Sequence, residues 1–226
     1  MKIIARIRSD YKEKFGIPRQ SGIADELTAK IVFEPEYRVK EALRGIDGYS
    51  HLWLIWQFSE AVREDWSPTV RPPRLGGNKR MGVFATRSPY RPNPIGLSSV
   101  KLVEIEHTKE YGDVLIVSGA DLLDGTPIYD IKPYLPFTDS HPEATAGFAE
   151  PVREYSLNVY FCKELLSKID ISKQNTLIKI LEHDPRPSYQ DDPGREYGMK
   201  FSDYEIFFKV NDKRLSVTRV EVIKDT

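Results

Sequence analysis

The stretch LSSVKLVEIEHTKEYGDVLIVS, residues 97–118, holds the clearest pair of strands in this chain of 226 residues. Leu97–Ile105 and Val114–Ser118 are rich in apolar and β-branched residues, a composition typical of strands. Gly112-Asp113 lies between them, and this residue pair is typical of a hairpin turn. The stretch therefore predicts two adjacent antiparallel strands.

The sequence before this hairpin is also rich in strand patterns. Four further strands are predicted, at Lys2–Arg8, Ala29–Phe33, Leu52–Phe58 and Met81–Thr86. Leu52–Phe58 shows little polar alternation, so we expect it to be buried on both faces. Apolar residues at helical spacing predict one helix between Val39 and Ile46. Because helices and strands do not alternate, the first half is predicted to be a β-barrel or a curled sheet.

The composition of the chain changes near residue 150. Helices are predicted at Cys162–Ile169 and Ser172–Glu182, followed by a hairpin of Phe201–Val210 and Leu215–Ile223 around Asn211-Asp212. We therefore expect a mainly β protein, with an N-terminal barrel domain at residues 1–150 and a smaller α+β domain at residues 151–226.

Composition limits the class of protein. Hydrophobic residues make up 40% of the chain and charged residues 30%, with a formal net charge of -1. These values are typical of globular domains. Cys162 is the only cysteine, which excludes an intramolecular disulfide and favours a cytoplasmic location. The histidines lack metal-ligand spacing, so no metal is expected, and the N-terminus lacks the apolar segment of a signal peptide. Neither a G-x-G-x-x-G nor a Walker motif is present, which disfavours the usual dinucleotide and P-loop sites.

Residues 66–103 contain no Asp or Glu, although acidic residues occupy 34 of the 226 positions. At that average, this window would hold about six of them. It contains seven Lys and Arg residues and many Pro and Gly residues. A positive field on a rigid, irregular backbone favours binding of a phosphate or carboxylate. The alternative is a solvated Pro-rich loop.

The segment TRSPYRPNPIG, residues 86–96, is the most irregular part of that window. Arg87 and Arg91 have the chemistry to clamp a phosphate or carboxylate, and Tyr90 could stack on a base. The alternative is a structural loop whose arginines pair with acidic neighbours.

Carboxylates with a possible chemical role follow in DLLDGTPIYDIKP, residues 121–133. Asp121 and Asp124 could face a cation, bind ribose hydroxyls or accept a proton, although an Asp-Gly pair is also common in turns. Asp130 and Lys132 would point to the same side of an extended backbone. Their alternative role is a surface ion pair of little energetic value. His51 could be a catalytic group, but such a histidine is more often a core residue.

Taken together, several motifs resemble the TsaA/TrmO-like family of S-adenosylmethionine-dependent tRNA methyltransferases. The matching segments are PRQ (18–20), HLW (51–53), RPPRLGGN (71–78), MGVFATRSPYRPNPIGLS (81–98), DLLDGTPIYDIKPYLPF (121–137) and DPRPSY (184–189). The two longest motifs are highly specific, and the likeness extends over nearly the whole chain.

The resemblance implies a fold, an assembly and a reaction. The implied fold is a β-barrel methyltransferase domain, unlike the Rossmann type, followed by a small C-terminal domain, and the implied assembly is a homodimer. The implied reaction transfers a methyl group from S-adenosylmethionine to the exocyclic nitrogen of threonylcarbamoyl-adenosine, just 3′ of the tRNA anticodon.

The same resemblance and the residue types suggest three sets of site residues. The expected methyl-donor site contains Pro18, Arg19, Gln20, His51, Leu52, Arg87, Leu97, Asp121, Leu122, Leu123, Asp124, Gly125 and Thr126. The expected catalytic residues are Asp130 as the base, His51 as the second candidate, and Lys132. The expected tRNA-binding residues are Arg71, Arg74, Lys79, Arg80, Tyr90, Arg91, Lys132, Tyr134 and Arg186 in the anticodon-arm contact.

Two other functions remain open from the residues alone. A non-enzymatic RNA-binding β-barrel would explain the acid-free window, but it gives Asp121 and Asp124 no role beyond turn formation. A methyltransferase of this family acting on a small molecule would keep the donor site and change the acceptor.

Overall fold

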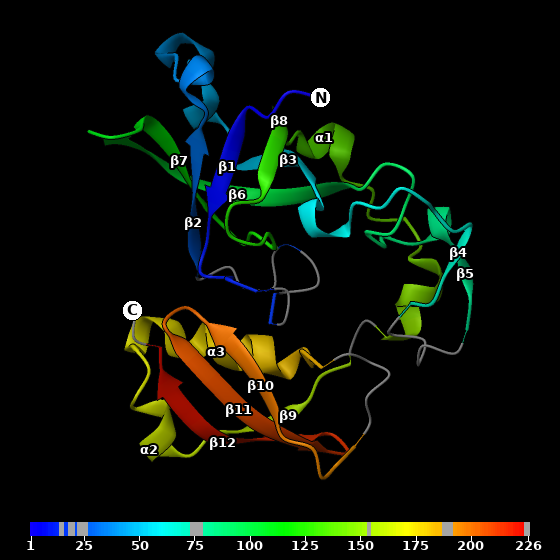
Figure 1. Ribbon diagram of the computed structural model, residues 1–226. Coiled ribbons are helices and arrows are strands. Elements are labelled where there is room, and N and C mark those ends of the chain that lie inside the picture. Colours follow the sequence, from blue (N-terminus) through cyan, green and yellow to red (C-terminus); the bar gives the residue numbers. More distant parts are fainter. Residues whose placement is uncertain are drawn as a thin grey trace.

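The computed structural model is mainly β and contains a six-stranded and a four-stranded sheet (Figure 1). It describes residues 1–13, 16–17, 21, 27–72, 79–152, 155–186 and 192–223. The four-stranded sheet lies beneath the larger one in the view of Figure 1. The prediction of a mainly β protein is confirmed.

The six-stranded sheet is antiparallel and closes on itself in the order β1-β2-β7-β6-β3-β8. Its strands are β1 (Ala5–Arg8), β2 (Thr28–Phe33), β3 (His51–Gln57), β6 (Ile95–Thr108), β7 (Gly112–Ser118) and β8 (Pro127–Pro133). The ring closes where Ala5 pairs with Ile128 and Arg6 with Pro127. Closure brings the start of the chain beside residues more than a hundred positions later.

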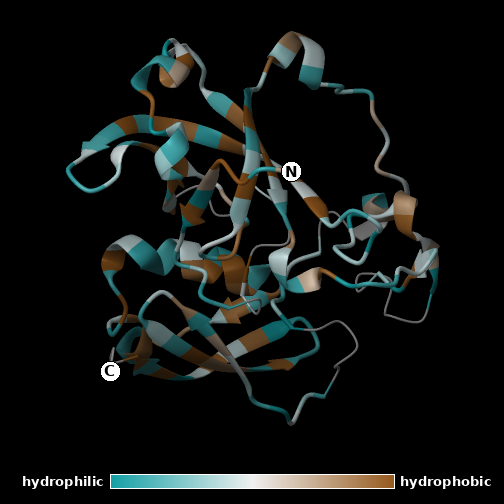
Figure 2. Cartoon of the chain, turned by 45° about the horizontal axis from the view of Figure 1, so that its top comes forward, coloured by the Kyte–Doolittle hydropathy of each residue, from teal (hydrophilic) through white to brown (hydrophobic). Residues whose placement is uncertain are grey.

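Apolar and polar residues alternate along the barrel strands, as the colours in Figure 2 show, and the apolar face of each strand lines the barrel core. In β3, Leu52, Leu54 and Trp56 are buried and the residues between them are partly or fully exposed. The expectation that this strand is buried on both faces is therefore wrong. The residues between the buried ones point to the outside of the barrel, where they are apolar but not fully covered.

Three local predictions also differ from the structure. The helix expected between Val39 and Ile46 is a series of short 3-10 turns, η1 (Pro35–Tyr37), η2 (Lys40–Leu43) and η3 (Ile46–Gly48). Gly45 separates the last two because its φ of 84° is left-handed and incompatible with a continuous helix. The hairpin of β6 and β7 forms as predicted, but its turn lies at residues 109–111 and Gly112 already begins β7.

The strand expected at Met81–Thr86 is only two residues long. It comprises β5 (Met81–Gly82), which pairs with β4 (Thr69–Val70), and the chain then enters the 3-10 turn η6 (Val83–Ala85). The Thr86 backbone N–H and hydroxyl both donate to the Val83 carbonyl, which stabilises this turn instead of a ladder.

The second sheet has the order β10-β11-β12-β9. Its strands are β9 (Asn158–Tyr160), β10 (Tyr197–Phe201), β11 (Tyr204–Asn211) and β12 (Arg214–Val222). The remaining elements are η4 (Ser59–Ala61), α1 (Pro136–Asp139), η7 (Gly147–Val152), α2 (Lys163–Leu166) and α3 (Ile171–Glu182). The predicted hairpin around Asn211-Asp212 and the second predicted helix are confirmed. The first predicted helix shortens to α2.

Each sheet has its own hydrophobic core. The barrel core includes Ile7, Ile31, Leu54 and Leu115, whereas α3 supplies Leu177 and its neighbours to the core of the second sheet. The division into domains at residue 150 stays a prediction. Tyr11, which follows β1, packs into the second core.

Gly96→Ala is expected to destabilise the barrel. A Cβ at Gly96 would overlap the indole of Trp56, its partner across β3 and β6. Overpacking of this kind costs roughly 1–3 kcal/mol or more. Urea unfolding should therefore show a lower midpoint than the wild type. Gly82→Ala is the matched control, because a Cβ there meets nothing within 4 Å. Equal midpoints for the two variants would contradict the tight approach at Gly96.

Candidate functional site

A chain of hydrogen bonds ends at Asp121, just beyond the end of β7. The Trp56 indole donates to the Ser98 hydroxyl over 3.0 Å, and this hydroxyl donates to Asp121 Oδ1 over 2.6 Å. Trp56 and Ser98 come from β3 and β6 and are buried inside the barrel. Three separate segments therefore fix the position of one carboxylate.

Asp121 is a perturbed acid. Burial raises the pKa of its carboxyl above the usual value, although the hydrogen bond from Ser98 and the positive charge of Arg87 oppose this effect. The backbone of Ser21 also hydrogen-bonds to Asp121. A mostly desolvated carboxylate near a guanidinium is a candidate for binding a polar or cationic ligand. Arg87 and Asp121, both predicted to bind the methyl donor, therefore lie close enough to interact.

Asp124 has a different environment from Asp121. Its Oδ1 accepts from the Ser9 backbone N–H at 3.0 Å, and its Oδ2 accepts from Lys12 Nζ at 2.9 Å. The Asp124 and Gly125 backbone N–H groups donate to the carbonyls of Tyr11 and Ile7. Both carboxylate oxygens thus already hold the chain that follows β1, which favours a structural role for Asp124.

The other predicted donor-site residues fall into three sets. Leu122 and Thr126 have buried side chains, whereas Leu123 and Gly125 are partly exposed beside Asp121. Leu52 is fully buried in the barrel, and the neighbouring His51 is exposed. The third set lies outside the described residues and comprises Pro18, Arg19 and Gln20, together with the tRNA-site residue Arg74. The donor-binding roles of all of them stay predictions.

A second set of predicted residues lies on the outside of the barrel, on β3, β6 and β8. This outer-face group comprises His51, Leu97, Asp130, Lys132 and Tyr134. Lys132 Nζ lies 3.1 Å from Asp130 Oδ2, which confirms that the two side chains share one side of β8. The ring centroids of His51 and Tyr134 are 6.2 Å apart.

The outer-face group and Asp121 lie on opposite sides of the barrel wall. Leu97 and Ser98 are neighbours in β6, but Leu97 is 58% exposed and Ser98 only 2%. Asp130 and Leu97 flank the same residue of β3, Ile55, in the strand register. Successive side chains of a strand point to opposite faces, so the structure does not bring Asp130 or Lys132 to the Ser98–Asp121 hydrogen bond within one chain.

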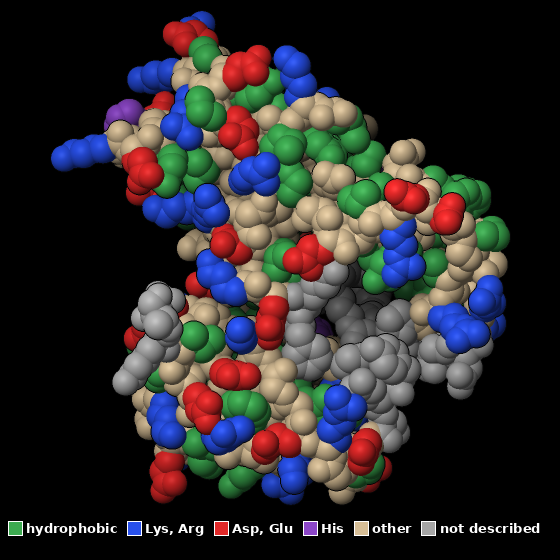
Figure 3. All heavy atoms as spheres, in the orientation of Figure 1, with side chains coloured by type: hydrophobic (Ala, Val, Ile, Leu, Met, Phe, Trp, Pro, Cys, Tyr) green, Lys and Arg blue, Asp and Glu red, His purple; other side chains and the backbone are tan. Residues whose placement is uncertain are grey.

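Residues 59–72 and 79–94, here called the basic lobe, project from the barrel around β4 and β5 (Figure 1). Arg71, Lys79 and Arg80 are exposed, and Figure 3 shows Lys and Arg side chains gathered at the outer end of this lobe. The Arg63 guanidinium lies 4.1 Å from the centroid of the Tyr90 ring. Exposed cations and aromatic rings together suit a nucleic-acid surface.

Two aromatic residues in the lobe were missed by the sequence analysis. Trp66 and Phe84 have ring centroids 6.1 Å apart and are 52% and 73% exposed. No alternation of apolar and polar residues around them predicts an exposed aromatic pair, and Phe84 falls within the strand expected at Met81–Thr86. Arg91 donates to the Thr86 carbonyl at 3.2 Å, so part of its guanidinium holds the loop rather than a ligand.

Arg186 lies apart from the lobe and is only 7% exposed. Its Nε and Nη2 each donate to Asp184 over 2.9 Å, and these hydrogen bonds raise the pKa of the guanidinium. A bidentate, buried ion pair favours a structural role. Contact between Arg186 and tRNA stays a prediction.

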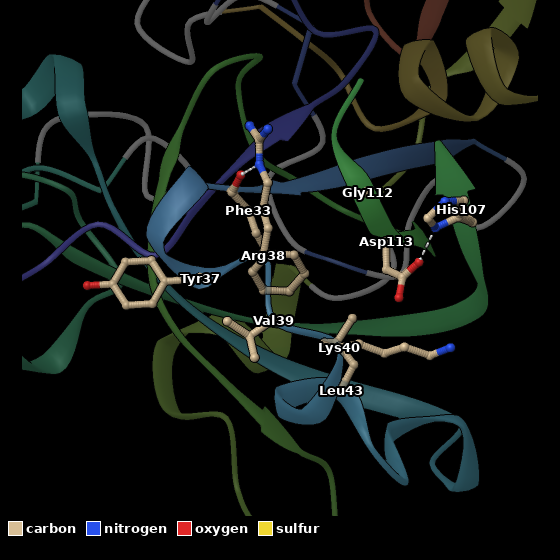
Figure 4. Close-up of a pocket in the computed structure, with 9 residues that line it drawn as sticks. All are labelled: Phe33, Tyr37, Arg38, Val39, Lys40, Leu43, His107, Gly112 and Asp113. Carbon is tan, nitrogen blue, oxygen red and sulfur yellow. Dashed lines mark hydrogen bonds and ion pairs between the residues drawn. The ribbon is translucent and has the colours of Figure 1, made fainter. Parts of the chain in front are cut away.

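A small pocket of about 200 Å³ lies near the β6–β7 hairpin turn (Figure 4). Tyr37, Arg38, Leu43 and His107 contribute to its lining. Along β6, His107 is nine residues from Ser98, about 30 Å at the usual strand rise. The pocket is therefore at the other end of the strand from Asp121, and no sequence motif predicted it.

Within the described ranges, no group of three or more His, Cys, Asp or Glu side chains could hold a metal ion. Among the helices of that same part of the chain, none is long and apolar enough to span a membrane.

The fold and the site define an antiparallel β-barrel protein with a partly buried carboxylate, Asp121, just beyond the end of β7. Comparison with protein families then gives its affiliation. Residues 6–140 match the model of the tRNA-methyltransferase O N-terminal domain, and residues 154–223 match the TrmO C-terminal domain. The chain belongs to the tRNA-methyltransferase O family, which confirms the family predicted from its motifs.

Individual relatives agree with this affiliation. The tRNA (adenine(37)-N6)-methyltransferase of Escherichia coli K12 is 42% identical over 226 residues, with 96% of each chain covered. A Pseudomonas aeruginosa protein, provisionally named an S-adenosylmethionine-dependent methyltransferase, is 39% identical and covers 90% of this chain and 89% of its own. A crystal structure of TrmO from Pseudomonas aeruginosa superposes with a TM-score of 0.74 at 33% identity, covering 97% of both chains.

Asp121→Asn is expected to leave the ligand-free protein at least as stable as the wild type at neutral pH. Because the folded-state pKa of Asp121 is raised, the folded protein binds more protons than the unfolded chain just above the usual pKa, and stability falls as pH rises through that window. The Asn variant lacks this dependence. Unfolding free energies from about pH 4 to about pH 8 would measure it.

Asp124→Ala is the comparison, because it removes a carboxylate that accepts hydrogen bonds from Ser9 and Lys12. It should cost about 1 kcal/mol at neutral pH. A loss of stability for Asp121→Asn as large as that for Asp124→Ala would contradict the distinction between a desolvated carboxylate and one that holds the backbone.

Proposed function

We propose that this chain is a tRNA methyltransferase that transfers the methyl group of S-adenosylmethionine to N6 of adenosine 37. The observation that carries the proposal is the partly buried Asp121 carboxylate, which accepts a hydrogen bond from Ser98 and lies near Arg87, in a chain of this family. The names of the E. coli relative and of the P. aeruginosa relative support the reaction and the methyl donor.

The residues at the end of the barrel fit such a donor. S-adenosylmethionine supplies an electrophilic methyl group on a sulfonium. Of Asp121 and Asp124, Asp121 is better suited to bind the methyl donor, because both carboxylate oxygens of Asp124 already accept hydrogen bonds from Ser9 and Lys12. Its negative charge would attract the sulfonium, the ammonium or the ribose hydroxyls, and Arg87 would attract the donor carboxylate.

The acceptor side of the reaction needs a base and, for threonylcarbamoyl-adenosine, a cation. The urea-like exocyclic nitrogen loses one proton as it forms its bond to the methyl carbon, while the carbon–sulfur bond breaks and leaves a neutral thioether. Asp130 is our candidate to accept that proton, with His51 second. Lys132, 3.1 Å from Asp130, would hold the threonyl carboxylate, and Tyr134 lies beside them.

A homodimer, implied by the family resemblance, is part of this proposal. Asp130 and Lys132 face away from the barrel interior that contains Ser98. Within one chain, the proposed base Asp130 and the proposed donor-binding residue Asp121 are therefore on opposite sides of the barrel wall. Leu97 is exposed on the same outer face, and Phe137, just beyond β8, is 85% exposed. These apolar side chains suit a contact between two copies.

The basic lobe is proposed to bind the anticodon arm. Arg71, Lys79 and Arg80 are exposed and would contact phosphates, and Tyr90 offers a ring for a base. Arg63 already covers the Tyr90 ring, so base stacking would use the ring's other face or displace the guanidinium.

Methyl transfer to tRNA tests the function directly. Labelled S-adenosylmethionine would be incubated with two tRNA pools, one carrying threonylcarbamoyl-adenosine and one from cells unable to make it. Label should enter only the modified pool and should map to adenosine 37. Label in both pools would disprove the requirement for the threonylcarbamoyl group, and no label in either pool would disprove the function.

Asp130→Asn should lower the single-turnover methylation rate about 100-fold or more, since a general base contributes at least that factor. Lys132→Ala should raise the KM for modified tRNA about tenfold, through loss of a charge-assisted hydrogen bond. The matched controls are Glu106→Gln and Lys30→Ala, which break a comparable surface ion pair of 2.8 Å on β6 and β2. If the control pair and the Asp130–Lys132 pair give the same kinetics, the latter is only a surface ion pair.

A further inference from the structure

After β1, residues 9–13 and 16–17 lie between the barrel and the second sheet (Figure 1). We call these residues the connecting segment. On its barrel side, the Ser9 hydroxyl donates to the Leu122 carbonyl over 2.9 Å, and the Tyr11 carbonyl accepts from the Asp124 backbone N–H over 2.8 Å. The connecting segment therefore directly supports the loop that carries Asp121.

The other side of the connecting segment contacts the second sheet. The Asp10 carbonyl accepts from the Ser202 backbone N–H over 3.2 Å, and Glu13 Oε1 accepts from the Lys200 backbone N–H over 2.8 Å. Lys173, on α3, donates to the Ser202 hydroxyl and lies 3.7 Å from Asp10 Oδ1. One lysine of the C-terminal half thus contacts both the second sheet and the connecting segment.

Packing adds to these polar contacts. The Tyr11 side chain is 4% exposed and belongs to the core of the second sheet. Gly16 lies so close to β10 that a Cβ there would be 2.7 Å from the Met199 methyl carbon. Ile17 and Leu27 also pack against this core. Little room is left for the connecting segment to shift without repacking the second sheet.

The Tyr11 hydroxyl is buried and, within the part of the chain that the structure describes, has no hydrogen-bond partner. An unpaired buried hydroxyl costs free energy, so its position is imposed by the packing around it. Burial raises the pKa of this phenol, and the charges of Asp10 and Asp121 add to the effect. Packing in the second core therefore places the Tyr11 ring, and the charge of Asp121 reaches its hydroxyl.

We propose that the second sheet and α3 are a positioning part of the methyl-donor site, and that Lys173 is the positioning residue that holds the connecting segment through Asp10 and Ser202. The inference rests on the proposed function, because it assigns a role relative to a donor bound at Asp121. It also gives the C-terminal half a task in the reaction: it fixes the backbone beneath Asp121 without touching the donor.

Calorimetric binding of S-adenosylmethionine to the full-length protein tests the inference, with tRNA affinity measured in parallel. Lys173→Met should weaken donor binding about tenfold and leave tRNA affinity unchanged, whereas Lys173→Arg should bind the donor within about twofold of the wild type. Lys163→Met is the matched control, because it removes the same charge from the exposed surface of α2. Thermal melting would establish that each variant is folded.

Asp10→Asn breaks the same contact from the barrel side and serves if Lys173→Met does not fold. Because Asp10 and Lys173 act through one contact, the double variant should weaken donor binding no more than the stronger single variant. Donor affinity unchanged in both single variants would overturn the inference and leave the proposed function standing. A wild-type protein that binds no donor would instead remove the proposed function, and the inference with it.

Discussion

Closure of the antiparallel ring between β1 and β8 is the constraint on which the site depends. Only two residue pairs, Ala5 with Ile128 and Arg6 with Pro127, form the ladder at this seam. Backbone bonds from Ile7 to Thr126 and from Gly125 to Ile7 extend the contact beyond it. The seam aligns the chain after β1 with the chain before β8, and both segments then surround Asp121.

Two carboxylates three residues apart show how that closure divides their roles. Both carboxylate oxygens of Asp124 accept hydrogen bonds, one from the Ser9 backbone and one from Lys12, and these bonds hold the chain after β1 in place. Asp121 is only partly exposed beside Ser98, and desolvation of its carboxyl raises its pKa. Desolvated carboxylates of this kind are typical of functional sites, because a ligand of opposite charge offsets the free energy lost on desolvation. The difference supports our proposal that Asp121 binds the methyl donor, whereas Asp124 holds the backbone after β1.

The second sheet contacts the same connecting segment that holds the Asp121–Gly125 loop. The connecting segment is bonded to the Asp121–Gly125 loop on one side and to Ser202, Lys200 and Lys173 on the other. Tyr11 is shared in the same sense, since its backbone belongs to the barrel seam and its ring to the second core. For the outer-face group, the proposed partner is instead a second copy of the chain.

The sequence by itself determined the features that depend on neighbouring residues. Strand alternation placed Asp130 and Lys132 on one side of β8, and the motifs identified the family. Local turn residues predicted the β11–β12 hairpin, whereas the strand patterns predicted the β6–β7 hairpin without locating its turn. Only the tertiary structure decided which groups meet. Gly45 turned a helical pattern into 3-10 turns, Leu97 and Ser98 went to opposite faces, and Asp121 rather than Asp124 became the desolvated acid. The physical reason is that periodicity is a property of a few adjacent residues, whereas burial and charge environment arise from ring closure between segments far apart in the chain.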